Sequence, residues 1–161
     1  MAVDYFLKLD GIDGESSDAK HKNEIDVESW SWGETQTGTF AAAGGAGAGK
    51  VQFQDFHFVT SVSKASPKLM LSCATGQHIK QAVLTARKAG QTQQEFMKFT
   101  FTDILISSYQ TGGSSSSDAL PTDQVSFNFA KIEFEYRVQR PDGTLDAPVK
   151  AGYDIKLNKQ V

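Results

Sequence analysis

A glycine-rich tract from Gly44 to Val51 is the stretch of this chain that comes nearest to a known chemical motif. Its letters, G-G-A-G-A-G-K-V, nearly match the phosphate-binding pattern G-x-x-x-x-G-K-[ST], whose backbone amides surround phosphates and whose final hydroxyl binds Mg²⁺. Val51 replaces that hydroxyl, and the residues beyond it are typical of a strand rather than of a helix whose first amides face a phosphate. The tract is therefore predicted to be a loop and not a nucleotide site.

Other residues that could perform chemistry are scattered. His21, His57, His78 and the single Cys73 do not include a pair with zinc-ligand spacing such as C-x-x-C or H-x-x-x-H. The chain has no G-x-S-x-G nucleophile motif, and its carboxylates are spread along predicted turns and strand faces, so no acid/base pair can be named. The sequence predicts no catalytic residues, no cofactor and no metal site, and hence a protein that is not an enzyme.

Trp30 and Trp32 have two interpretations. Two indoles at positions i and i+2 of a strand can line a groove for a sugar or an exposed base, or they can fill the interior of a curled sheet. The chain supplies many phenylalanines as buried neighbours, which favours the interior. In that case Ser29 and Ser31 must point out of the opposite face of the same strand.

Composition limits the class of protein. The 161 residues suit one domain, residues 1–161, and a single cysteine cannot form an intrachain disulfide, which fits folding in a reducing compartment such as the cytoplasm. The first residues contain neither a basic region nor a long apolar run, so we expect no Sec signal peptide and no membrane insertion. Sixteen basic and nineteen acidic side chains leave a net charge of −3 without long blocks of one sign, which makes nucleic acid an unexpected partner.

Three long segments alternate apolar and polar residues but change phase part-way, as strands do when they bend at a bulge or pass between sheets. They run over residues 25–32, 51–60 and 125–138. The phase changes lie at residues 28–29, 54–55 and 130–131. Shorter alternating segments predict strands at residues 3–9, 79–88, 96–102, 104–109 and 153–157.

One helix is predicted at residues 66–76. Ser66 is expected to cap it, Pro67 suits its first position, and Gly76 suits a left-handed end. Leu69, Met70 and Cys73 would form its apolar stripe. The fold class is therefore mainly β: a curled antiparallel β-barrel or two-sheet sandwich with one short flanking α-helix.

The order of several motifs resembles the haemolysin-coregulated protein (Hcp) family, the inner-tube subunits of type VI secretion systems. The motifs are M-A-V-D at the start, G-E-S at Gly14, E-I-D-V followed by W-S-W-G, the tract ending in G-K-V, and R-K-A-G. The likeness covers essentially the whole chain. It implies hexameric rings that stack into a tube inside a contractile sheath, with a spike at the tip, and expulsion of the tube from a Gram-negative cell by sheath contraction.

The resemblance also assigns roles to residues. The outward face that carries Ser29 and Ser31 would line the central channel and contact small effector proteins. The glycine-rich tract would dock on a neighbouring subunit. Ordering its nine or so alanines and glycines costs about 10 kcal/mol of backbone entropy, which their small side chains do not offset within one chain. The residues assigned to this subunit and ring-stacking loop are Gly44, Gly45, Ala46, Gly47, Ala48, Gly49 and Lys50.

Two other functions fit the same patterns. A monomeric β-barrel could bind carbohydrate or another small ligand through Trp30 and Trp32, and a phage tail-tube protein would share the ring architecture. Oligomeric state and genomic neighbours distinguish these alternatives.

Overall fold

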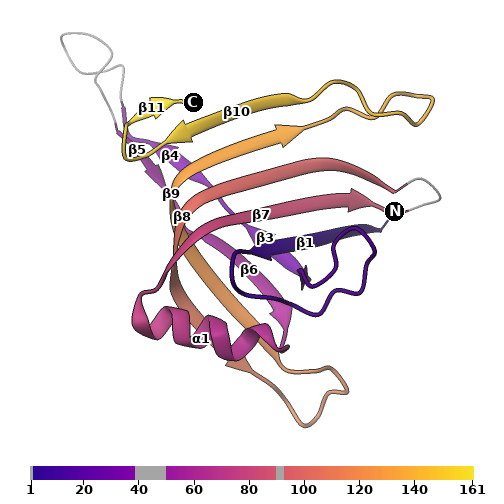
Figure 1. Cartoon of the computed structure of the whole chain (residues 1–161), viewed down its shortest axis with the longest axis vertical. Helices are drawn as coiled ribbons and strands as arrows, with labels where there is room; N and C mark the ends of the chain where they lie inside the picture. Colours follow the sequence, from indigo (N-terminus) through magenta and orange to yellow (C-terminus); the bar gives the residue numbers. More distant parts are fainter. Residues whose placement is uncertain (1, 39–49, 90–92) are drawn as a thin grey trace.

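The computed structural model describes residues 2–38, 50–89 and 93–161, and its main feature is a strongly curled antiparallel sheet (Figure 1). The strands are β1 (Val3–Leu9), β2 (Ile25–Val27), β3 (Ser29–Ser31), β4 (Glu34–Gln36), β5 (Val51–Phe53), β6 (Phe56–Ser61), β7 (His78–Lys88), β8 (Gln94–Gly112), β9 (Thr122–Tyr136), β10 (Val149–Asp154) and β11 (Lys159–Gln160). One helix, α1 (Ala65–Thr75), lies between β6 and β7 in the chain. The mainly β prediction with one short helix is confirmed for the described residues.

The main sheet has the order β11-β10-β9-β8-β7-β1-β2, and β3 joins it through β6, which pairs with β9. The same side of β9 is shared by two strands, because β6 pairs with residues 122–127 and β10 with residues 131–136. The change of partner falls at Ala130 and Lys131, where the sequence changes phase. The predicted phase change is confirmed, and it is the point at which the sheet divides.

The other two predicted bends are also confirmed. The segment 25–32 divides at Glu28 into β2, which pairs with β1, and β3, which pairs with β6. The segment 51–60 divides at residues 54–55 into β5, which pairs with β4 in a small second sheet, and β6. Each phase change marks a strand that leaves one partner for another.

The sheet curls but does not close. β2 and β6 approach each other through single hydrogen bonds, such as that from Thr60 Oγ1 to the Asp26 carbonyl at 2.7 Å, and no ladder joins these two strands in the described chain. The closed-barrel form of the prediction is therefore wrong. An open curled sheet leaves strand edges that a closed barrel would not have.

The interior is built around aromatic rings. Phe56, Phe58, Phe101 and Phe127 are fully buried, and the Trp30 indole stacks on Phe56 with ring centroids 5.9 Å apart. The Trp32 ring also packs on this core, and its Nε1 donates to the Gln54 carbonyl at 2.9 Å. Both indoles are half-buried and pack against the core, which confirms the interior interpretation of the two tryptophans.

Predictions for the helix are corrected at Ser66, Pro67 and Met70 and confirmed at Gly76. Pro67 is the third helical residue rather than the first. Helix α1 begins at Ala65 rather than after a Ser66 cap, because the Ser66 hydroxyl bonds to the buried Asp123 carboxylate instead. Met70 is 54% exposed and does not join the apolar stripe, whereas Leu69 is buried. The left-handed Gly76 end, with φ of 67°, is confirmed.

Two predicted strand boundaries also differ from the structure. Residues 96–102 and 104–109 belong to one strand, β8, which continues through Asp103 in a left-handed conformation with φ of 57°. The last strand ends at Asp154 instead of continuing to Leu157. Its chain turns because the Leu157 amide donates to Asp154 Oδ1 at 2.9 Å and Asn158 is left-handed.

Candidate assembly and cargo surfaces

A polar face covers the outer side of a four-stranded part of the sheet. Strands β3, β6, β9 and the end of β8 pair side by side here, so their outward residues form two cross-strand rows. One row is Ser31, His57, Ser126 and Ser108, and the other is Ser29, Val59, Gln124 and Gln110. These eight side chains include no carboxylate, lysine or arginine, and we call them the polar face.

Ser29 and Ser31 are both exposed on this face, while Trp30 between them points to the core. The predicted outward orientation of the two serines is confirmed. The imidazole of His57 lies in the middle of the polar face, where its Nδ1 is 3.0 Å from Ser126 Oγ. Neutral hydroxyl and amide groups offer hydrogen-bond donors and acceptors without a strong electrostatic field. The polar face therefore suits contact with many polar protein surfaces.

The two outer strands of this four-stranded part each have a side without a strand partner in the described chain, and we call these sides the free edges; helix α1 also packs against β8. β3 pairs only with β6, and the pairing of β8 with β7 stops at Leu105, which leaves residues 106–112 without a strand partner on that side. Unpaired strand edges expose rows of backbone donors and acceptors and readily pair with another chain. The polar face is thus bounded by two edges that are able to extend the sheet.

An apolar strip lies at the far end of β9 and β10. Phe134, Tyr136 and Val149 share one side of the sheet, and they are 39%, 43% and 69% exposed. The Phe134 ring packs on Phe99 at 4.2 Å, so the strip continues the core outward to the surface. Contiguous exposed apolar side chains of this kind mark contact surfaces.

Most of the glycine-rich tract lies outside the described residues. This applies to Gly44, Gly45, Ala46, Gly47, Ala48 and Gly49, whereas Lys50 is described and exposed. Pairing of Gln36 with Val51 brings the two sides of the connection together at the base of the β4–β5 hairpin. Strand β5 begins at Val51, so the residues after the tract form a strand as predicted and not the helix of a phosphate site.

The histidines and the cysteine occupy separate surroundings. His21 lies in the loop of residues 10–24 and stacks on Phe6 of β1, His57 is on the polar face, and His78 is exposed beside Asp103 at 3.0 Å. Cys73 is partly buried on α1. The structure does not bring these four residues together.

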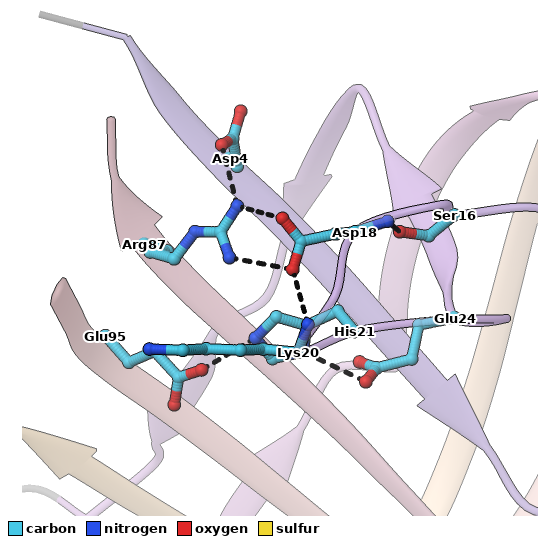
Figure 2. Close-up of polar contacts among 8 residues, drawn as sticks. All are labelled: Asp4, Ser16, Asp18, Lys20, His21, Glu24, Arg87 and Glu95. Carbon is cyan, nitrogen blue, oxygen red and sulfur yellow. Dashed lines mark hydrogen bonds and ion pairs between the residues drawn. The ribbon is translucent and has the colours of Figure 1, made fainter. Parts of the chain in front are cut away.

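A buried ionic cluster was missed by the sequence analysis (Figure 2). Arg87 of β7 is 2% exposed, and its guanidinium donates to both carboxylate oxygens of Asp18, at 3.0 and 2.6 Å, and to Asp4 at 3.4 Å. The guanidinium also lies 4.8 Å from the centre of the Phe6 ring. These contacts fasten the loop of residues 10–24 to the sheet. The only sequence clue is a basic residue at an outward position of a strand near an acidic loop.

Acid should weaken this attachment. The hydrogen bonds from Arg87 lower the pKa of the Asp18 carboxyl below its ordinary value of 3.8. Because the pKa of Asp18 is lower in the folded than in the unfolded chain, its contact with Arg87 stabilises the fold fully above the ordinary value of 3.8. This stabilisation is lost progressively as pH falls below 3.8. We expect Asp18→Asn to flatten the decline in thermal stability between about pH 4 and pH 2, with Asp13→Asn in the same loop as the control. An unchanged decline in Asp18→Asn would contradict the assignment.

A second missed group is Asp123 on β9, which is completely buried. Its carboxylate accepts hydrogen bonds from the Ser66 hydroxyl of α1 and, at 2.8 Å, from the Tyr109 hydroxyl of β8. Burial, and then the bond to Asp123, raise the pKa of Tyr109 above its ordinary value of 10. Asp123 therefore joins the helix to two strands that carry the polar face.

Comparison with known proteins identifies the family. Residues 6–136 match the family described as "Type VI secretion system effector, Hcp". The chain is 50% identical to protein hcp1 of Pseudomonas aeruginosa over 162 residues, which cover 99% of each protein. This chain belongs to the Hcp family.

Solved Hcp structures share its fold over the whole chain. Hcp1 from Salmonella typhimurium superposes with a TM-score of 0.82 at 38% identity, covering 100% of both chains. A structure described as a type six secretion system protein gives a TM-score of 0.94 at 28% identity, covering 99% of this chain and 100% of the other. This Hcp is thus a structural, secreted tube subunit of a type VI secretion system and not an enzyme, and the secretion system is favoured over the phage alternative. Within the described residues, no helix is long and apolar enough to span a membrane.

Proposed function

We propose that this Hcp forms hexameric rings whose central channel is lined by the polar face. The observation that carries the proposal is the position of that face between two free strand edges, β3 and residues 106–112 of β8. Pairing of these two different edges between neighbouring copies would continue the sheet around a ring. A contact between two different surfaces of each copy gives a closed ring when the rotation from one subunit to the next is a whole fraction of a full turn.

Ring formation would also cover the apolar strip. Tyr136 and Val149 are 43% and 69% exposed, and a neighbouring copy packed on the apolar strip would remove them from water. The rings would then stack, and the tract from Gly44 to Lys50 is proposed to contact a neighbouring subunit. The whole chain, residues 1–161, would act as one tube domain.

The proposed partners follow from this assembly. The outside of the stacked rings would face the contractile sheath and the end of the tube would carry the spike, after assembly in the bacterial cytoplasm. Small effector proteins would travel in the channel, where Ser29 and Ser31 offer hydroxyl groups to their surfaces. The eight side chains of the polar face include no carboxylate, lysine or arginine, so this face would hold such cargo weakly enough for release after expulsion.

Light scattering and negative-stain imaging of the purified chain test the proposal. We expect a mass near that of a hexamer of 17.5 kDa chains, and rings with open centres. A particle of monomer mass at high protein concentration, with no rings, would overturn it.

A further inference from the structure

His21 is held unusually firmly for a residue in a loop. Its side chain is buried, with 6% of the residue exposed, and its ring lies flat on Phe6, with centroids 4.4 Å apart and planes at 6°. Nδ1 is 2.9 Å from Glu24 Oε2, and Nε2 is 2.6 Å from Glu95 Oε1 (Figure 2). The ring therefore bridges the end of the loop and the beginning of β8.

The two carboxylate contacts require a particular protonation state of the His21 imidazole. An ionised carboxylate only accepts hydrogen bonds, and a neutral imidazole has one N–H and one lone pair. Both contacts are therefore hydrogen bonds only when both ring nitrogens carry protons. We propose that His21 is a proton-dependent latch, which holds the loop of residues 10–24 on β8 while the imidazole is charged and releases Glu95 when it is neutral.

The surrounding charges make His21 the group that balances the two carboxylates. Arg87 of β7, which also contacts Phe6, is occupied by Asp18 of the loop and Asp4 of β1. In the described part of the chain, the ion pairs of Glu24 and Glu95 are those with His21. Lys20 of the same loop lines a groove together with Glu95.

Release would begin at Glu95. Its side chain is 39% exposed, against 14% for Glu24, so the Glu95 carboxylate can turn into water when the Nε2 proton is lost. Backbone bonds within the loop, such as Ser16 N to Glu24 O at 3.0 Å and Asn23 N to Ser16 O at 2.9 Å, lie next to Glu24. Release of Glu95 removes a contact that holds this part of the loop against the sheet, so these bonds would open more often. Because the charged imidazole makes the contacts, the latch is strong on the acidic side of the His21 titration and weakens as pH rises.

Glu95 also lines a groove with Lys20, Lys98, Arg137 and Glu135, in which Arg137 pairs with Glu135 at 3.7 Å. When the latch opens, the Glu95 carboxylate becomes available to the lysines of this groove instead of to His21. The charge of this groove is thereby linked to the protonation of a buried residue. This inference does not depend on ring formation.

NMR of the full chain tests the latch. We expect nitrogen shifts typical of a doubly protonated ring for His21 at about pH 6.5, and a roughly tenfold loss of amide-exchange protection at Ser16 and Asn23 by about pH 9, after correction for base catalysis. Glu95→Gln is the decisive variant, because its amide can donate to a neutral Nε2 and so removes the pH dependence. His78→Gln, at an exposed histidine, should behave as the native chain. A singly protonated His21 ring at about pH 6.5, or an equal loss of protection in Glu95→Gln, would overturn the proposal.

Discussion

Replacing Tyr136 and Val149 together by aspartate is expected to convert the proposed hexameric ring into monomers. These side chains face each other across β9 and β10 and are 43% and 69% exposed, so the isolated fold tolerates polar groups there. In the ring, each aspartate would have to be buried without a partner, at a cost of about 2–4 kcal/mol in every subunit contact. Since a ring contains one such contact per subunit, the penalty is repeated around it and assembly should be lost at micromolar concentration.

Sedimentation velocity measures this result directly, together with the unfolding temperature of the variant. Met70→Asp is the matched control, because Met70 is an equally exposed apolar residue, at 54%, on α1 and away from the strip. The control should form rings like the native chain. Intact rings of the double variant would show that the apolar strip is not part of the contact between subunits.

Replacing Asp123 by alanine is expected to destabilise the folded subunit by about 3 kcal/mol. The change leaves the Ser66 and Tyr109 hydroxyls in the interior without their acceptor, and an unsatisfied buried hydroxyl costs roughly 1–3 kcal/mol. It also detaches the beginning of α1 from β8 and β9. Asp118→Ala, at an exposed position in the loop before β9, should change stability little.

Chemical denaturation gives the free energy of unfolding, and titration of tyrosine absorbance gives an independent readout. The carboxylate of Asp123 contributes to the raised pKa of Tyr109, so this pKa should fall in the variant towards its ordinary value of 10. If unfolding free energy and Tyr109 titration both stay unchanged, Asp123 does not hold the helix as described.

The sequence was most informative where hydrophobic periodicity was interrupted. The phase changes at Glu28, at residues 54–55 and at Ala130 each predicted a bend, and each is a place where a strand exchanges one partner for another. Periodicity reports which side of a strand is buried, and a change of sheet reverses that side. It does not report whether the last pair of strands completes a ladder, so it could not distinguish a closed barrel from the open sheet.

The polar face could be predicted only in part. The alternation around Trp30 placed Ser29 and Ser31 outward, but His57, Ser108 and Ser126 join them through pairings between segments far apart in the chain. The same limit explains the missed clusters. Arg87 is separated from its partner Asp18 by 69 positions in the chain, and Asp123 from Ser66 by 57, so local patterns do not identify either pair.

Amide exchange at the two free edges is the most direct test of ring closure through strand pairing. It compares assembled rings with subunits kept apart by the Tyr136→Asp and Val149→Asp changes. We expect amides of β3 and of residues 106–112 to exchange slowly in the ring and rapidly in the separated subunit, while those of β1 and β7 are protected in both. Equally rapid exchange of both edges in intact rings would contradict the proposed closure.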